Sequence, residues 1–216
     1  MKRQKLARDT KETTERVKRT YSSGYLTLVS IIQAIIFGYF IVTLGENFTD
    51  ITPLKALISL STFLVIIIIW NEYMIGSTTL RYIPRLTESS LPFLVGFTEF
   101  LIIFHIFSVL HLWFYSLAAS TFVGFFSYLN VFSSAMKDPE NGPIFQRLGN
   151  WPTMTEMFCY ISTIIFIIFG VISYIYSLRI NVHYLLVCIV ILMQVAFFYR
   201  GIKYWELTIG KPQNRG

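Results

Sequence analysis

The chain has few charged residues and almost no cysteine. Only 14% of its 216 residues are Asp, Glu, Lys or Arg, whereas 54% are hydrophobic. A soluble globular domain carries about 25% charged residues, so this composition argues against a soluble domain. The two cysteines, Cys159 and Cys188, each lie inside an apolar stretch, which argues against a disulfide framework. We expect them to pack as small hydrophobic side chains.

The sequence also lacks the usual signatures of catalysis. It contains no HExxH, GxSxG or CxxC motif and no glycine-rich loop of the kind that holds phosphate groups. The three histidines have no carboxylate at a spacing that would suit a metal site or a proton relay. We therefore expect a protein that is not an enzyme and that holds no metal and no cofactor.

What the chain has in abundance is long apolar segments. A helix of about 20 residues crosses the roughly 30 Å of bilayer hydrocarbon, and four of the five apolar segments are close to this length. They cover residues 25–44, 54–70, 91–135, 155–178 and 182–199. This pattern predicts an all-α integral membrane protein that crosses the bilayer several times.

The third segment decides how many crossings there are. As one straight helix, its 45 residues would extend about 67 Å, more than twice the thickness of the hydrocarbon. It therefore either folds back, near residues 111–116, or projects far from the membrane. Folding back gives six spans with both termini in the cytoplasm, and a long third helix gives five.

The distribution of basic residues favours six spans, because Lys and Arg gather in cytoplasmic loops. The six-span arrangement leaves only Lys55 and Arg179 of the 18 basic residues outside, whereas five spans would divide them 11 to 7. Tryptophan prefers the membrane interface, and six spans place all four tryptophans there, with Trp113 at the outer turn. The predicted fold is thus a six-helix transmembrane bundle with cytoplasmic termini.

The segments divide the chain into five parts. We expect a basic cytoplasmic tail, a four-span membrane core, a cytoplasmic loop, a two-span hairpin appended to the core, and a cytoplasmic C-terminal tail. These parts cover residues 1–24, 25–135, 136–154, 155–200 and 201–216. Frequent Ile, Phe, Lys and Asn are typical of an AT-rich bacterial genome, so we expect the bacterial cytoplasmic (inner) membrane.

The N-terminal tail concentrates positive charge. Residues 1–23 hold eight Lys or Arg against three acids. The tail could set the topology and contact anionic lipids, at about 1 kcal/mol per basic residue, or it could dock an acidic cytoplasmic protein. Nucleic acid is not expected as a partner, because acids interrupt the basic residues and no aromatic residues alternate with them. The candidate surface-binding or partner-binding residues are Lys2, Arg3, Lys5, Arg8, Arg16, Lys18 and Arg19.

Glu99 is the only carboxylate deep within an apolar segment. An acid at the centre of a membrane helix costs roughly 2.5–3.5 kcal/mol, so it needs a partner or a task. It lies about 12 Å from the inner end of its helix, and five of the six expected helices carry a polar group near this depth. The second helix has Val65 there instead. The predicted polar layer consists of Gln33, Glu99, Ser127, Tyr128, Thr163 and Gln194.

Two interpretations of this layer stay open. The polar groups could join helices through hydrogen bonds worth about 0.6 kcal/mol each, with a neutral Glu99 donating to Gln33 or Gln194. Alternatively, the layer could line a hydrated path in which Glu99 binds a proton or a cation.

Two further features concern packing and the loops. Ser120, Gly124 and Ser127 form a stripe of small residues, which favours close helix packing within one chain or between subunits. Glu72 lies at the inner end of the second span, where an ion pair with Arg81 or Arg85 would hold the following loop.

The sequence therefore predicts a non-enzymatic membrane subunit. We expect it to form homo-oligomers in the lipid bilayer and to anchor or recruit a cytoplasmic protein partner, as a sensor or an assembly platform. The alternative is an oligomeric ion channel or a proton-coupled transporter that uses the polar layer around Glu99.

Overall fold

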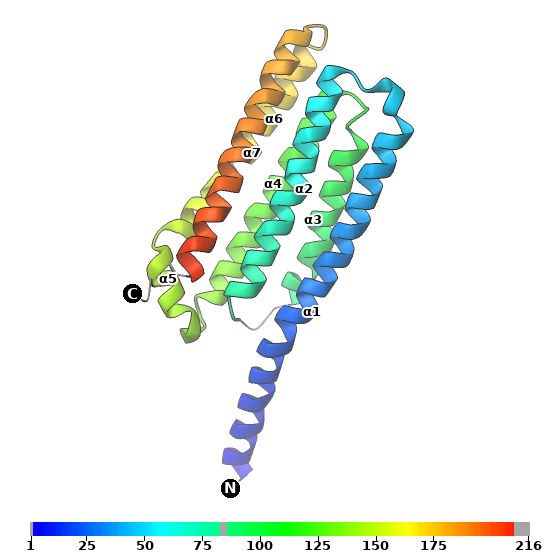
Figure 1. The fold of residues 1–216 in the computed structure, drawn as a ribbon. Coiled ribbons are helices and arrows are strands. Elements are labelled where there is room, and N and C mark those ends of the chain that lie inside the picture. Colours follow the sequence, from blue (N-terminus) through cyan, green and yellow to red (C-terminus); the bar gives the residue numbers. More distant parts are fainter. Residues whose placement is uncertain (1, 83–85, 210–216) are drawn as a thin grey trace, which may run out of the picture.

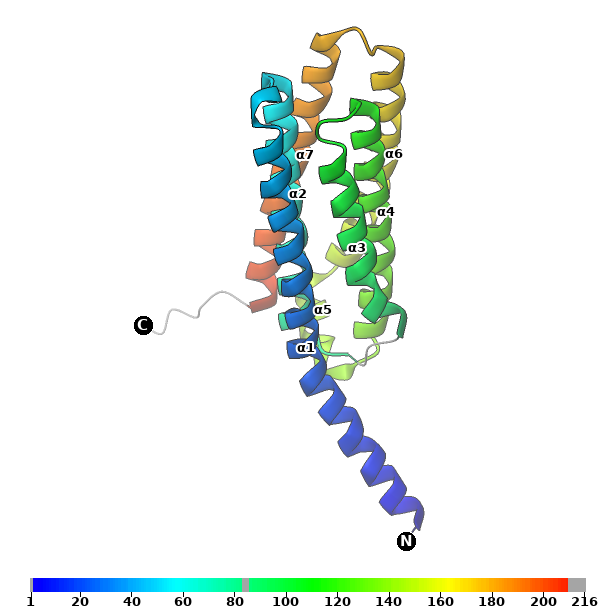
Figure 2. The ribbon, with the colours of Figure 1, turned by 90° about the vertical axis from the view of Figure 1, so that its right-hand side faces the viewer.

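The computed structural model describes residues 2–82 and 86–209, which form a bundle of long helices with no strand among them (Figures 1 and 2). The long helices are α1 (Lys2–Glu46), α2 (Pro53–Thr79), α3 (Leu86–Phe104), α4 (Leu110–Ala135), α6 (Trp151–Ile175) and α7 (Ile180–Ile209). The short elements η1 (Phe48–Asp50), η2 (Pro139–Asn141) and α5 (Gly142–Leu148) lie in the connections. The predicted all-helical class is confirmed.

Five helices of the described chain are long and apolar enough to cross a membrane. They are residues 23–46 of α1 together with α2, α4, α6 and α7. Helix α3, which is 19 residues long, is not among these five. Several apolar helices of this length indicate a multi-pass membrane protein.

The long third segment is divided into two helices. Helix α3 ends at Phe104 and α4 begins at Leu110, and the two helices pack side by side (Figure 2). The connection lies at residues 105–109, so the predicted reversal at residues 111–116 was placed too late. His105 Nδ1 lies 2.8 Å from Ser116 Oγ, and this bond ties the turn to the second turn of α4.

Trp113 lies in the first turn of α4, beside the α3–α4 connection, but its side chain is buried within the bundle. It belongs to α4, its side chain is 0% exposed, and its Nε1 donates to Thr62 Oγ1 of α2 at 3.1 Å. A buried indole is tolerated where its N–H finds an acceptor, and Thr62 supplies that acceptor here.

Helix boundaries follow local capping signals. Thr52 Oγ1 accepts a hydrogen bond from Lys55 N at 3.3 Å, and Pro53 occupies the first position of α2, where it loses no helical hydrogen bond. Helix α5 stops at Gly149, whose φ of +53° lies in the left-handed region that favours glycine. Helix α1 contains no proline, and it continues unbroken beyond the bundle (Figure 1).

The connections divide between two ends of the bundle. Helix α5, the end of α7 and the extension of α1 lie at one end, and η1, residues 105–109 and the α6–α7 turn lie at the other (Figures 1 and 2). We call the first the basic end, because Arg81, Lys137, Arg147 and Lys203 lie in or beside its connections.

The last two long helices do not form a separate hairpin. Helix α6 packs along α4 and α7 packs along α2, whereas α6 and α7 touch each other little. Helix α7 also continues to Ile209, so part of the expected C-terminal tail is helical, and residues 210–216 lie outside the described chain. Residues 155–200 are therefore built into the core.

The half of the bundle near the opposite end is closely packed. Ile102, Ile103, Ile106, Trp113 and Phe114 are each at most 1% exposed and belong to one buried cluster. A smaller cluster around Ile75, Phe132 and Tyr204 lies toward the basic end. Between these two clusters lies a cavity that is partly open to the outside of the bundle.

Candidate functional site

An interior cavity of about 190 Å³ lies among the helices. Helices α2 and α7 form one side of it and α4 and α6 the other, and most of its wall is hydrocarbon from residues such as Val65, Ile68, Leu117, Phe166 and Phe197. An apolar cavity of about 150 Å³ in another protein is large enough to bind benzene. This cavity therefore has room for a small organic molecule.

A buried ion pair lies in the cavity wall. Arg200 Nη2 of α7 lies 2.9 Å from Glu72 Oε1 of α2, and the Arg200 and Glu72 side chains are only 14% and 15% exposed. Tyr128 of α4 donates to Glu72 Oε2 at 2.6 Å, and Arg200 Nη1 donates to Thr155 Oγ1 of α6. The Arg200 guanidinium also lies 4.1 Å from the centre of the Phe197 ring. One network thus joins four of the six long helices that line the cavity.

This pair differs from the ion pair expected for Glu72. Arg81 instead binds Glu140, at 3.0 Å on an exposed surface, and Arg85 lies outside the described residues. The sequence-based predictions counted Arg200 only among the basic residues on the cytoplasmic side and at the inner end of the last span. The sequence feature that could have predicted this pair is that Arg200 and Glu72 are opposite charges, each near the inner end of an apolar helix.

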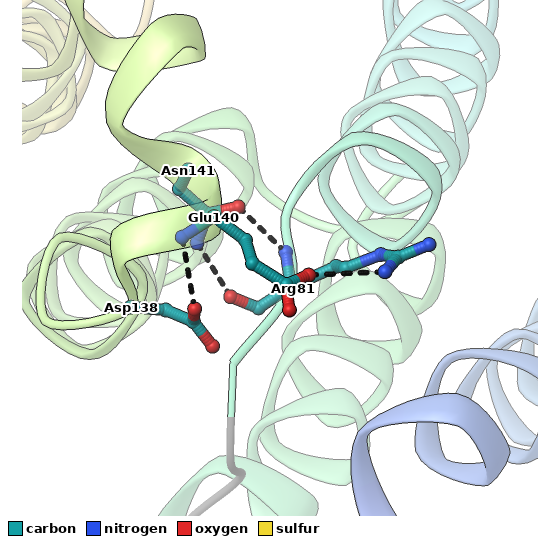
Figure 3. Close-up of polar contacts among 4 residues, drawn as sticks. All are labelled: Arg81, Asp138, Glu140 and Asn141. Atoms are coloured by element: carbon teal, nitrogen blue, oxygen red, sulfur yellow. Dashed lines mark hydrogen bonds and ion pairs between the residues drawn. The ribbon is translucent and has the colours of Figure 1, made fainter. Parts of the chain in front are cut away.

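The first residues after α2 border the cavity at the basic end. Leu80 and Tyr82 line the cavity, and Arg81 between them is held by Asn141, which is 1% exposed (Figure 3). Arg81 N donates to Asn141 Oδ1 at 3.0 Å, and Asn141 Nδ2 donates to the carbonyl oxygens of Arg81 and Ala135. Asp138 accepts from Glu140 N at 3.1 Å and so supports the turn that carries Asn141 (Figure 3).

Tyrosine side chains pack against Tyr82, at the start of the connection that follows α2. Tyr21, in α1 before its membrane segment, lies 5.2 Å from Tyr25 and 6.1 Å from Tyr82, measured between ring centres. Burial, followed by the nearby charge of Glu88, raises the pKa of Tyr21 to about 12. The Tyr21 phenol is therefore neutral at physiological pH.

The structure brings Gln33 and Glu99 together. Gln33 Nε2 of α1 donates to Glu99 Oε2 of α3 at 2.8 Å, and the two residues are 7% and 1% exposed. Gln194 of α7, the other partner considered for Glu99, instead accepts from Ser61 Oγ at 2.9 Å. Ser61 belongs to α2. The sequence indicated only the apolar Val65 at this depth in that helix, but α2 does supply a polar partner.

The remaining members of the predicted layer bond elsewhere. Thr163 of α6 lies 2.9 Å from Thr121 of α4, measured between hydroxyl oxygens, and Ser127 donates to the carbonyl of Val123 in its own helix. Tyr128 belongs to the Glu72 network described above. The six residues thus form five separate contacts. The Gln33–Glu99 bond and three others each join a different pair of helices, and the fifth lies within α4.

The stripe of small residues faces the interior. Ser120, Gly124 and Ser127 all line the cavity, and a Cβ placed on Gly124 would lie 3.9 Å from Cys159 Sγ of α6. The stripe therefore helps to define the cavity wall between α4 and α6.

The basic tail lies on the extension of α1. The backbone is helical from Lys2 onward, and Arg16 is exposed. The side chains of the other candidates, Lys2, Arg3, Lys5, Arg8, Lys18 and Arg19, lie outside the described part of the structure. Over the residues described, no three His, Cys, Asp or Glu side chains come together as a metal site would require.

The interior of the bundle therefore offers a cavity with one charged pair, together with a separate Gln33–Glu99 contact. Comparison of the chain with models of known protein families, with curated proteins and with solved structures finds no match.

Proposed function

We propose that the chain is a non-catalytic membrane subunit that anchors or recruits a cytoplasmic protein through the extension of α1. The observation that carries this proposal is the continuity of α1 from Lys2 to Glu46 (Figure 1). The 21 helical residues before the membrane segment extend roughly 30 Å at 1.5 Å per residue. They carry all eight basic residues of the tail, far enough from the bundle to contact another protein.

In this proposal α3 is also a span, which gives six spans with both termini in the cytoplasm, in a bacterial inner membrane. Two observations support this orientation. The α3–α4 turn lies at the same end as η1 (Figure 2), and basic residues are concentrated at the other end. Because Lys and Arg favour the cytoplasmic side, the basic end is assigned to the cytoplasm.

The proposal includes self-association into homo-oligomers. Many apolar side chains on the outside of the bundle are exposed, including Met157, Ile161, Ile164 and Ile168 of α6. Such a surface suits lipid as well as a second copy, so cross-linking of the full chain in membranes is the measurement that decides the oligomeric state.

A second candidate function is proton or ion transport through Glu99. The observation that favours it is that Glu99 Oε1 is buried and has no hydrogen-bond partner among the described residues. Two features favour the anchoring function instead. The half of the bundle around Ile103 and Phe114 is closely packed, and the polar groups are bound in separate pairs rather than in one chain. Flux in reconstituted vesicles, compared between the native chain and Glu99→Gln, separates the two functions.

Charge reversal on the extension tests the anchoring function. We would compare the native chain with an Arg16→Glu, Lys18→Glu, Arg19→Glu variant, after cross-linking in intact membranes and identification of the attached proteins. The matched control is Arg16→Lys, Lys18→Arg, Arg19→Lys, which keeps both the charge and the helix propensity. A specific partner should be lost on charge reversal and kept in the control. Recovery of the same proteins from all three chains would exclude docking through the extension.

A further inference from the structure

We propose that the interior cavity binds a small neutral amphiphile, with an apolar body and one uncharged oxygen that accepts hydrogen bonds, such as an alcohol, ether, ketone or ester. The inference concerns a ligand site inside the bundle and does not depend on docking through α1. Three properties of the cavity wall define the ligand: its hydrocarbon surface, its balanced charge and its unpaired donors.

The hydrocarbon surface selects an apolar body. Val65, Ile68, Leu117, Phe166 and Phe197 come from four different helices and surround the cavity. A molecule the size of a substituted benzene ring fits the volume of about 190 Å³. Burial of its apolar surface against these side chains supplies the main favourable energy, at about 25 cal/mol per Å².

The charge balance of the wall selects an uncharged head group. Glu72 and Arg200 neutralise each other at 2.9 Å, and Tyr128 and Thr155 each add a hydrogen bond to the pair. A carboxylate or ammonium ligand would compete for one member of this pair and leave the other charge unpaired in a buried place. An unpaired buried charge is strongly unfavourable, so both kinds of charged ligand are disfavoured.

The unpaired donors select an oxygen acceptor. Arg200 Nε and Gln194 Nε2 are buried, and neither has a hydrogen-bond partner in the part of the chain that is described. Both residues line the cavity and both atoms are donors, although neither atom is exposed to the cavity as the side chains stand. A buried donor without an acceptor costs about 1–3 kcal/mol, which a ligand oxygen recovers once the side chain rotates toward it. The two residues are six positions apart on α7, about 9 Å along its axis, so a ligand with one oxygen meets one of the two donors.

A series of fluorinated probes tests the class of ligand on the unaltered full chain in nanodiscs. Fluorine NMR would follow saturable binding of 4-fluorobenzyl alcohol, 4-fluorotoluene, 4-fluorobenzoate and 4-fluorobenzylamine, with empty nanodiscs as the reference for partition into lipid. The alcohol should bind at least about tenfold more tightly than each of the other three, because it alone combines an apolar body, neutrality and an acceptor. Equal binding of the charged probes, or no saturable binding of the alcohol, would overturn the proposal, and the latter result would mean that the cavity holds no ligand of this class.

Matched substitutions locate the site. Ser120→Leu fills the cavity from α4, and Ser133→Leu makes the same change at an exposed position of the same helix. Ser120→Leu should weaken binding of the alcohol about tenfold or more, and Ser133→Leu should leave it unchanged. If Ser120→Leu does not fold, Ser162→Leu fills the cavity from the facing helix α6. Unchanged binding in a folded cavity-filling variant would place the ligand elsewhere and refute the site.

Discussion

Glu72 and Arg200 are separated by 128 positions in the chain, yet their side chains meet at 2.9 Å between α2 and α7. Both side chains are largely buried, whereas the ion pairs Arg81–Glu140 and Lys203–Glu206 are exposed. The Glu72–Arg200 contact joins helices that frame the cavity, so its loss should affect the stability of the whole bundle.

The first prediction concerns this pair. Glu72→Gln or Arg200→Met alone should lower the free energy of unfolding by about 3–5 kcal/mol, because each leaves a buried charge without its partner. The double variant should lose less than the sum of the two single variants. Reversible denaturation in mixed micelles measures these differences. Arg81→Ala is the control, because its exposed pair with Glu140 should contribute no more than about 1 kcal/mol.

The second prediction concerns Glu99. Glu99→Gln keeps an oxygen that can accept from Gln33, so it should change the free energy of unfolding by no more than about 0.6 kcal/mol. Glu99→Leu removes the acceptor and leaves a buried amide unpaired, which should cost about 1–3 kcal/mol. Denaturation of Gln33→Leu and of the Gln33→Leu, Glu99→Leu double variant completes the cycle. An additive result would show that the two side chains do not interact.

The third prediction compares two glycines at the α4–α6 interface, one with no room for a Cβ atom and one with room for it. A Cβ on Gly170 would lie closer than 3.0 Å to the ring of Tyr115, so Gly170→Ala should destabilise the bundle by about 1–3 kcal/mol. The matched change Gly124→Ala introduces only an ordinary 3.9 Å contact and should be nearly neutral or stabilising. Thermal unfolding compares the two variants. A Tyr115→Ala background should relieve most of the cost of Gly170→Ala, and persistence of the full cost there would contradict the proposed clash.

The fourth prediction concerns the number of spans. In a chain whose two cysteines are replaced by serine, Asp50→Cys and Ser108→Cys should react with an impermeant maleimide on intact cells. Lys137→Cys should react only after the membrane is opened. If only the five long apolar helices cross the membrane and α3 does not, residue 137 would lie on the same side as residue 50. Labelling of Lys137→Cys on intact cells would therefore rule out six spans.

The sequence predicted those features that depend on local composition. Apolar segments gave the helical class and the approximate positions of the long helices, because the length needed to cross hydrocarbon is the same in any fold. The apolar segment that predicted α2 ends at residue 70, whereas the helix continues to Thr79 and carries Glu72 to its partners within the bundle. The reversal after α3 was misplaced because residues 105–109 contain no glycine or proline and His105 is held by a residue of the next helix.

The depth of a residue along its helix was not enough to predict which helices contact each other. Counting residues placed Gln33 level with Glu99, and the structure joins them. The same count placed Gln194 near that level but gave no indication of which side of α7 faces α2, so Ser61 was missed. The rotation of a helix about its axis is set by the packing of all its neighbours, and a single apolar segment with little amphipathic pattern carries little information about it.

The unbroken course of α1 has a mechanical consequence. The helix has no proline at which it could kink, and it carries Gln33 about 17 positions after Arg16, or roughly 26 Å along its axis. Ser23 and Gly24, a pair at which helices also kink, lie where the arm meets the membrane segment, and α1 changes direction where it leaves the bundle (Figure 2). A load applied to the free arm therefore reaches the contact with Glu99 only in part, because bending at this junction absorbs some of the displacement. In this geometry the arm is a hinged lever, and the Gln33–Glu99 contact lies on the side of the hinge that is buried in the bundle.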